Sequence, residues 1–356
     1  MRYCLAPYSQ AGFEEKTLCF GFGSIQQKIP CQRFQRTLLE VAAYWKTPRT
    51  EDEVLSKFSQ RHQIEEVVDF LFEGNFLMRA GIFQSDERFS RHALFYNLSG
   101  ADPREVQKSL ATKHVVVVGC GGIGNMISGS LATLGVGKIT LIDRDYIEPS
   151  NLSRQLLFTE DDVGESKVEV LARALRARDA SAHIETLEMC LNHPADLENI
   201  PPCDLIVLSA DKPARLPLWM NDFAVQTRTA MINVGYVQDI AVWGPFVIPG
   251  KTGCWRCQAL TATAESEDKR MTTLLHDINS GYQAPSIGPV NMMAASHALI
   301  DILKYLGGFG QITSLNKRLG IWTHDLRFDS QPCQLNPSCS VCGHLQSKWI
   351  ERTAMS

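Results

Sequence analysis

A glycine-rich turn between a strand and a helix constrains the fold of this 356-residue chain more than any other feature. The segment His114–Gly119 (HVVVVG) is an apolar run that ends in glycine, as is typical of a buried parallel strand. It leads into Gly119–Gly124 (GCGGIG) and an apolar-periodic helix, and Lys138–Asp143 (KITLID) then predicts a second strand that ends on an acid. In such a βαβ unit the glycines let the backbone approach phosphates at a helix N-terminus, and the acid binds ribose hydroxyls. The predicted nucleotide-binding residues are Gly119, Gly121, Gly122, Gly124 and Asp143.

The same alternation of helices and strands continues through the rest of the chain. It predicts an α/β fold with a doubly wound, Rossmann-like parallel sheet, whose ligands bind at the carboxyl ends of the strands. Asp211 lies just past one such end. The expected elements are a helix over 166–178, strands over 183–187, 204–210 and 230–235, and a late helix over 291–306.

The overall composition excludes several classes of protein. Lys and Arg number 35 against 39 Asp and Glu, and this near-balance argues against a nucleic acid or an anionic membrane as the main partner. No apolar run approaches the roughly 20 residues that span a bilayer, and the first residues lack the apolar region of a secretory signal. We therefore expect a cytoplasmic protein with more than one domain.

Four of the 11 cysteines form two C-x-x-C pairs, Cys254/Cys257 and Cys339/Cys342. Two such pairs complete a tetrahedral zinc site, and each pair lies beside turn-forming residues that suit a zinc knuckle. The pairs are much farther apart in the sequence than in a compact zinc finger, so the site would tie the end of the chain to its middle. Two unrelated turns, or one redox pair, are the alternatives. We expect the other seven cysteines to be packing residues.

Residues 1–85 predict a small domain of their own. After a strand-like start over 17–25, helices are expected over 33–45, 50–59 and 64–72, with a strand or hairpin over 75–83. Thr50 and Glu53 form a capping box at the start of the second helix. This is a winged-helix-like pattern, but residues 1–100 carry 12 basic and 12 acidic residues, which disfavours DNA as the ligand. We expect this domain to dock a protein or peptide.

Polar residues after the second strand indicate which chemistry the nucleotide undergoes. Two cations, Arg154 and Lys167, and a carboxylate, Asp211, follow the phosphate turn. A dehydrogenase that uses NAD would leave the two cations without a role, whereas nucleotidyl transfer from ATP needs cations to offset charge on the phosphate. Asp211 would then be a ligand of Mg²⁺.

At this point the ordered motifs carry a clear resemblance. GCGGIG, D-x-D-x-I-x-x-S-N-L-x-R-Q, a downstream lysine, S-A-D and two C-x-x-C pairs, over about residues 86–345, resemble the E1-like adenylating superfamily of ubiquitin-activating and ThiF/MoeB-type enzymes. The resemblance implies an adenylation domain over residues 86–356, ATP and Mg²⁺ as cofactors, a structural Zn²⁺, a homodimer, and adenylation of a carboxylate with release of pyrophosphate. It also implies roles for individual residues. Gly121 and Gly122 would lie at the phosphates, and Asp143 would bind the ribose with Asp145 beside it. The residues that surround the phosphates would be Asn151, Arg154, Gln155 and Lys167. Asp211 would bind the metal, and Arg91 of the R-x-S-R motif would reach into the partner's active site.

Simpler interpretations of these residues stay open. Asp143 could cap the end of a strand, and Arg154 and Lys167 could be solvated charges on a helix. Asp211 could cap the next helix, since Asp-Lys-Pro suits a helix N-terminus. Arg91 could be an ordinary surface charge.

Two departures narrow the resemblance. Many relatives have a further cysteine in the crossover loop, but here the loop, about residues 258–285, contains none, and an N-terminal domain is added. Both features resemble the peptide-antibiotic maturases of the microcin C and pantocin type. The resemblance implies ATP-dependent adenylation of a carboxylate on a ribosomal precursor peptide that docks on residues 1–85, followed by cyclisation, dehydration or nucleotide-type modification.

Two other functions remain as alternatives. The first is adenylation of the C-terminal glycine of a ubiquitin-like sulfur-carrier protein. The second is a non-catalytic, nucleotide-sensing regulator that binds DNA. The sequence specifies neither the activated carboxyl group, the nucleophile that attacks the adenylate, the number of ATP used, nor the final product.

Overall fold

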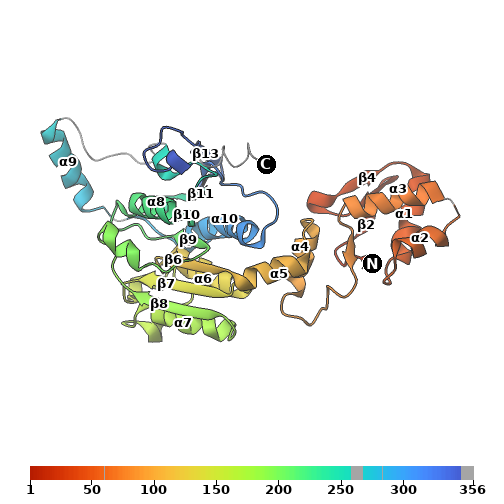
Figure 1. Cartoon of the computed structure of the whole chain (residues 1–356), viewed down its shortest axis with the longest axis horizontal. Coiled ribbons are helices and arrows are strands. Elements are labelled where there is room, and N and C mark those ends of the chain that lie inside the picture. Colours follow the sequence, from red (N-terminus) through yellow and green to blue (C-terminus); the bar gives the residue numbers. More distant parts are fainter. Residues whose placement is uncertain (60, 258–267, 283, 346–356) are drawn as a thin grey trace. The chain divides into compact units, whose positions relative to one another are not determined.

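The computed structural model describes residues 1–59, 61–257, 268–282 and 284–345 and contains two compact units (Figure 1). The first unit comprises Met1–Lys108 with Gly307–Gly310, and the second comprises Ser109–Leu306 with Gln311–Ser356. The domain boundary expected at residue 85 lies inside the first unit. Residues 258–267 and 283 of the expected crossover loop lie outside the described residues.

Three helices form the centre of the first unit, as the sequence predicts: α1 (Gln32–Tyr44), α2 (Glu51–Lys57) and α3 (Arg61–Glu73). Their apolar faces meet in a core in which Leu38 and Leu71 are fully buried. The capping box at α2 is present, because the Thr50 hydroxyl accepts a hydrogen bond from the Glu53 amide at 3.2 Å and the Glu53 carboxylate accepts one from the Thr50 amide at 2.8 Å. Such a cap stabilises a short helix by about 1 kcal/mol.

Two small sheets accompany these helices. β1 (Tyr3–Leu5) pairs antiparallel with β5 (Leu77–Arg79), which lies in the strand or hairpin region expected after α3. The other sheet has the order β2-β3-β4 and was not predicted as a sheet; only its middle strand falls in the expected strand-like segment. Its strands are β2 (Ala11–Glu14), β3 (Thr17–Phe20) and β4 (Gln27–Ile29), and α4 (Ser90–Leu98) and α5 (Pro103–Thr112) follow β5.

The second unit is built on an eight-stranded sheet with the order β13-β12-β11-β10-β9-β6-β7-β8. The five strands from β10 to β8 run parallel, which confirms the predicted Rossmann-like parallel sheet. An antiparallel extension, β11 to β13, continues this sheet and was not predicted. The strands are β6 (His114–Val118), β7 (Lys138–Asp143), β8 (His183–Glu188), β9 (Leu205–Leu208), β10 (Ala230–Val237), β11 (Ile240–Val247), β12 (Lys317–Trp322) and β13 (Phe328–Pro332).

Helices cover both faces of the parallel strands. Val115 to Val118 of β6 are all buried, as expected for a strand with side chains packed on each side. α8 (Leu216–Thr227) lies on one face, where Met220 packs with Val116 and Ile206. On the antiparallel strands, Trp243 of β11 stacks against His297 with ring centroids 4.7 Å apart. That histidine belongs to α10 (Gly288–Gly307), and the other helices are α6 (Gly122–Leu134), α7 (Lys167–Arg178) and α9 (Lys269–Ser280) (Figure 1).

Helix α6, which follows β6, begins after one glycine and ends at another. Gly121 is the N-cap of α6, and Gly135 ends the helix in the left-handed conformation at φ +80°. A glycine at this position carries no penalty for positive φ, which makes it the usual helix terminator. Among the described residues, no helix has both the length and the apolar composition needed to cross a lipid bilayer.

Candidate functional site

The glycine turn after β6 is closely packed except at one position. Gly119 has φ +93°, and a Cβ atom there would lie 2.7 Å from the Ala210 amide nitrogen. A Cβ atom on Gly124 would lie 1.8 Å from the Gly119 carbonyl oxygen. A Cβ atom on Gly121, in contrast, would meet no atom within 4 Å. The turn therefore leaves space in front of the α6 N-terminus, where backbone N–H groups bind phosphate.

Asp143 ends β7 beside this turn. One oxygen of its carboxylate accepts a hydrogen bond from the Cys120 amide at 2.6 Å, and the other accepts one from the Asp145 amide at 2.9 Å. With these two bonds Asp143 caps the end of the strand, which was the alternative interpretation of this residue. Each carboxylate oxygen still has a lone pair that could accept a hydrogen bond from a ligand. Burial raises the pKa of the Cys120 thiol well above its usual value, which favours the neutral thiol over the nucleophilic thiolate.

Lys167 begins α7 and is buried, not a solvated helix charge. Its side chain is 8% exposed, and its ammonium lies 3.1 Å from a carboxylate oxygen of Asp145. The Lys167 amide also donates to the Asp145 carbonyl at 3.0 Å. The Asp145 side chain is 55% exposed. In this ion pair Lys167 is therefore buried, whereas Asp145 is accessible to solvent.

The segment after Asp145 packs against the glycine turn. Asn151 and Gln155 are buried, and Gln155 Oε1 has no hydrogen-bond partner among the described residues. The Arg154 guanidinium donates to the Ser150 carbonyl at 2.9 Å, and a Cβ atom on Gly122 would lie 3.3 Å from the Arg154 carbonyl oxygen. The predicted amide and guanidinium groups therefore come from a segment that touches the start of α6.

Asp211 follows β9 at the same edge of the sheet. The preceding residue, Ala210, lies against Gly119 of the glycine turn. Asp211 is therefore only one residue away from a direct neighbour of that turn. Its side chain is exposed and does not cap the next helix, because α8 begins at Leu216 with Arg215 at the N-cap. An exposed carboxylate beside a phosphate site fits a Mg²⁺ ligand.

Arg91 belongs to the first unit, in the first turn of α4, and is exposed. An exposed guanidinium could reach another protomer, as its predicted role requires. Its donation to a partner's active site stays a prediction.

Sequence reasoning missed one buried amide at the site. α10 begins at Gly288, three residues before the expected start, and this places Asn291 inside its first turn. The Asn291 side chain lies against Gly122, since a Cβ atom on Gly122 would be 2.2 Å from Asn291 Nδ2. Pro289, which is favoured in a first helical turn, is the signal that could have moved the predicted start.

The four cysteines of the two C-x-x-C pairs come together and are buried. Their sulfurs lie within 4.8 Å of one another. The separations are 3.8 Å for Cys254–Cys339, 4.0 Å for Cys254–Cys257 and 3.3 Å for Cys257–Cys342. Tetrahedral zinc with Zn–S bonds of about 2.3 Å places sulfurs about 3.8 Å apart. The Asn336 amide also donates to Cys257 Sγ at 3.4 Å, as a thiolate ligand requires. The donor set therefore fits zinc.

Of the other seven cysteines, three are buried, two are partly buried and two are exposed. Cys333 is buried beside the four-cysteine cluster, and its thiol donates to the Cys254 carbonyl at 3.1 Å. Cys31 and Cys190 are exposed, so the expectation that all seven are packing residues is wrong for these two.

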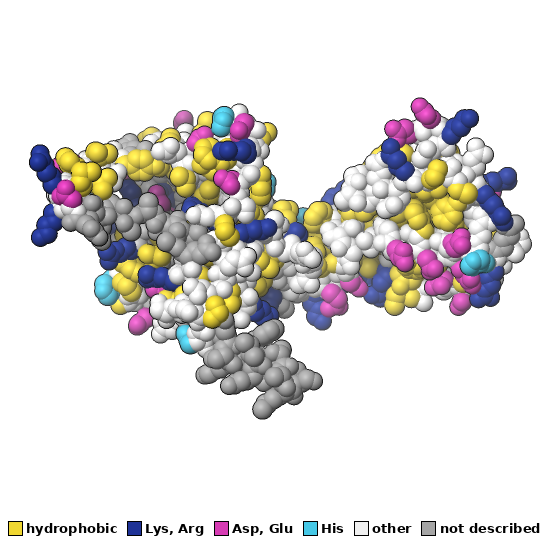
Figure 2. All heavy atoms as spheres, turned by 90° about the horizontal axis from the view of Figure 1, so that it is seen from above, with side chains coloured by type: hydrophobic (Ala, Val, Ile, Leu, Met, Phe, Trp, Pro, Cys, Tyr) yellow, Lys and Arg dark blue, Asp and Glu magenta, His cyan; other side chains and the backbone are white. Residues whose placement is uncertain are grey.

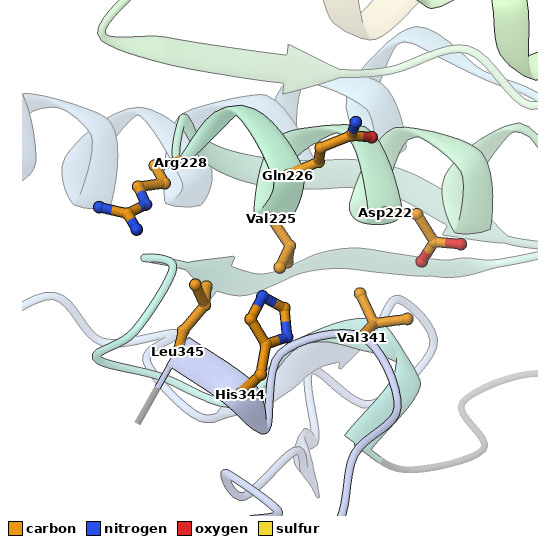
Figure 3. A pocket seen from close by; sticks show the side chains of 7 residues that line it. All are labelled: Asp222, Val225, Gln226, Arg228, Val341, His344 and Leu345. Atoms are coloured by element: carbon orange, nitrogen blue, oxygen red, sulfur yellow. The ribbon is translucent and has the colours of Figure 1, made fainter. Parts of the chain in front are cut away.

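A cavity of about 410 Å³ lies away from the nucleotide turn, between α8 and the segment 341–345 (Figure 3). Val225, Val341 and Leu345 point toward one another across it, and Arg228 and Asp222 lie at its two ends (Figure 3). None of the predicted nucleotide-site residues lines this cavity. Its apolar lining residues belong to the same hydrophobic core as the four cysteines.

The chain is similar in sequence to known proteins. The ThiF family model matches residues 89–341. The sulfur carrier protein adenylyltransferase of Thermus thermophilus is 30% identical over 245 residues, which cover 67% of this chain and 85% of that protein.

Solved structures extend the similarity to almost the whole chain. The crystal structure of E. coli MccB with ATP is 37% identical, with a TM-score of 0.91, over 96% of this chain and all of MccB. MccB is described as a microcin C7 biosynthetic enzyme and has also been solved in complex with N-formylated MccA. The fold of PaaA matches with a TM-score of 0.69 over 92% of this chain, at 21% identity. The chain belongs to the ThiF family of E1-like, ATP-dependent adenylating enzymes.

Proposed function

We propose that this enzyme adenylates a carboxylate on a ribosomally made precursor peptide, with release of pyrophosphate, as a step in peptide-antibiotic biosynthesis. The proposal is supported by which parts of this chain match the ThiF family model and which match MccB. The family model begins at residue 89, so it does not include most of the first unit. The match to MccB covers 96% of the chain and therefore includes most of that unit. MccB, which has been solved in complex with N-formylated MccA, thus shares with this chain the unit that the ThiF family model leaves out.

The first unit offers a surface that suits a peptide better than a nucleic acid. Figure 2 shows acidic and basic side chains side by side on its visible face, with hydrophobic side chains between them. Phe13 is 60% exposed on β2, at the edge of the three-stranded sheet, and Phe22 is 51% exposed. The Phe22 ring approaches the position that a Cβ atom on Gly12 would take, at 3.9 Å, so Phe22 lies alongside β2. Exposed aromatic side chains on an edge strand are typical of a peptide-docking site.

The second unit provides the groups for adenylyl transfer. The phosphates of ATP would occupy the space in front of Gly121, and Asp143 would bind the ribose. A carboxylate oxygen of the peptide attacks the α-phosphorus, the bond from that phosphorus to the β-phosphate oxygen breaks, and pyrophosphate leaves with the electron pair. Negative charge grows on the phosphate oxygens during this step, and Arg154 and Lys167 offset it.

Three further parts complete the proposal. Mg²⁺ at Asp211 would bind phosphate oxygens and neutralise their charge. Zn²⁺ at the four cysteines would be structural, because a site filled by four thiolates has no position left for a substrate. The enzyme would act as a homodimer in which Arg91 of one protomer reaches the active site of the other.

The mixed anhydride then reacts with a nucleophile. An amine or amide of the peptide that attacks the carbonyl carbon would release AMP and give a product that has lost water. A peptide nitrogen that attacks the phosphorus would form an N–P bond, displace the carboxylate as the bond from phosphorus to its oxygen breaks, and keep AMP on the peptide. These two products differ in mass, so mass spectrometry distinguishes them.

The test is incubation of the enzyme with ATP, Mg²⁺ and the short peptides encoded next to its gene. The proposal expects ATP consumption and a mass change that require one such peptide. Changing both Phe13 and Phe22 to Ala should raise KM for the peptide and leave KM for ATP unchanged. Activity with a ubiquitin-like protein alone, and with no peptide, would refute the choice of substrate.

A second function is favoured by a specific observation. The Thermus thermophilus relative is a sulfur carrier protein adenylyltransferase, and the match covers 85% of it. The same adenylation could therefore act on the C-terminal glycine of a small carrier protein. The first unit would then have no assigned role, which is why we place this function second.

A further inference from the structure

The first turn of α10 carries a buried amide that is only partly hydrogen-bonded. Asn291 is 2% exposed. Its Nδ2 donates to the Ser286 hydroxyl at 3.3 Å, and its Oδ1 has no hydrogen-bond partner among the residues that the structure describes. Buried acceptors without a donor are rare in folded proteins because they have lost their water and gained nothing in return.

This amide lies at the nucleotide turn. A Cβ atom on Gly122 would be 2.2 Å from Asn291 Nδ2 and 3.3 Å from the Arg154 carbonyl oxygen, so the three residues meet at one point. Gly122 is the first residue of α6, and its neighbour Gly121 faces open space. The helices that carry these residues, α6 and α10, both belong to the second unit (Figure 1). Asn291 therefore borders the space in which the phosphates would bind.

The phosphate end of the nucleotide does not provide a suitable donor for Asn291 Oδ1, and the amino group of adenine lies at the opposite end of the molecule. Phosphate oxygens are acceptors, and two acceptors placed together repel each other. The ribose hydroxyls of ATP are donors, but their expected partner is Asp143. The other molecule that must approach the α-phosphorus is the acyl substrate, and a peptide brings an N–H group close to its own terminal carboxylate.

We propose that Asn291 positions the substrate: its Oδ1 accepts a hydrogen bond from the last backbone N–H of the peptide. This inference rests on the proposed adenylation of a peptide carboxylate. Only the Cα atom separates that nitrogen from the carboxyl carbon. Holding the N–H group therefore limits where the carboxylate can point, and orients it toward the α-phosphorus.

The test uses stable mimics of an acyl adenylate, so it does not depend on the identity of the peptide. One probe is sulfamoyl-adenosine that carries an N-acetylglycyl group, which contains the N–H. The other carries an acetoxyacetyl group, in which an ester oxygen replaces that N–H and leaves the shape almost unchanged. Their dissociation constants are measured by calorimetry with the full-length enzyme.

Wild-type enzyme should bind the amide probe about tenfold more tightly than the ester probe, because one hydrogen bond to a buried acceptor is lost. Asn291→Ala should abolish this preference, and binding of AMPCPP to the variant shows that its nucleotide site is still folded. Asn291→Asp keeps an acceptor oxygen at the same place and should keep the preference. Met292→Ala changes an exposed neighbour on α10 and is the matched control, which should also keep it.

Each other result has a distinct meaning. Equal binding of the two probes by wild-type enzyme, or a preference that survives in Asn291→Ala, would overturn the role of Asn291 alone. Binding of AMPCPP together with binding of neither probe would overturn the proposed carboxylate adenylation, and this inference with it.

Discussion

Replacing Lys167 by methionine separates a catalytic role from a structural one. The substitution shortens the unbranched side chain by only one heavy atom and removes its charge. Lys167 is 8% exposed, so its apolar stem packs in the fold, whereas its partner Asp145 is 55% exposed and regains water when the ion pair is lost. Removing a buried charge whose partner is accessible to solvent changes the free energy of unfolding little, by about 1 kcal/mol or less.

The expected loss of activity is much larger. If the ammonium offsets charge that grows on the phosphate oxygens, its removal should lower kcat by about 10²- to 10³-fold, which corresponds to roughly 3–4 kcal/mol of transition-state stabilisation. The loss of transition-state stabilisation should therefore exceed the loss of unfolding free energy by about 2 kcal/mol or more.

The measurements are thermal unfolding and the rate of pyrophosphate release for Lys167→Met. Lys113→Met is the control, because Lys113 also forms an ion pair, with Asp204 at 3.0 Å, and these two residues directly precede β6 and β9. The control should lose little activity. A Lys167→Met enzyme with normal activity, or one whose lost activity is fully explained by unfolding, would refute the reasoning.

Three more predictions concern the metal site, the glycine turn and acid stability. Cys339→Ser should remove one zinc ligand, lower the zinc content and lower the unfolding temperature, as should treatment of the wild-type enzyme with a chelator; metal analysis and calorimetry measure both. Gly121→Ala should fold normally, because a Cβ atom there meets nothing within 4 Å, but should weaken ATP binding in calorimetry, because the methyl group enters the space for the phosphates. The pKa of Asp162 would be raised by burial, but hydrogen bonds from Thr159 and Arg173 lower it overall. Its stabilisation is therefore present above the unfolded pKa and is lost as pH falls below about 4, which unfolding measured against pH should show.

Matched variants make these predictions specific. Cys333→Ser alters a buried thiol beside the cluster that is not part of either C-x-x-C pair, so its zinc content should stay normal. Gly124→Ala should unfold the enzyme, in contrast to Gly121→Ala, because its Cβ atom would lie 1.8 Å from a carbonyl oxygen. Asp162→Asn should be less stable than wild type at neutral pH and should lose part of the fall in stability at acid pH. Equal zinc content in Cys339→Ser and wild type would contradict the metal assignment.

The parts of the fold that the sequence predicts are those with strong local patterns. β6 is a run of valines followed by glycines, and its burial on both faces makes the run continuous. The capping box at Thr50 and Glu53 is likewise a local signal, since both partners lie within one helical turn. The four cysteines are far apart in the sequence, but metal chemistry constrains them to meet.

The parts that were missed depend on tertiary packing or on weak patterns. β11 contains Gly244 and Pro245, which argue against a strand in sequence reasoning, yet β11 pairs on both sides in the sheet. β2 and β4 have only four and three residues, too few for alternation to be recognised. The contact between Asn291 and Gly122 joins residues far apart in the chain, and no spacing rule connects them.

The central claim is that ATP is attacked at its α-phosphorus by a peptide carboxylate. The most direct measurement is the return of label from radioactive pyrophosphate into ATP. The account predicts exchange that requires the precursor peptide, that is lost when the reacting carboxyl group of the peptide is blocked, and that falls about 10²-fold or more in Lys167→Met. Formation of ADP and phosphate in place of pyrophosphate, or exchange that proceeds equally well without the peptide, would contradict it.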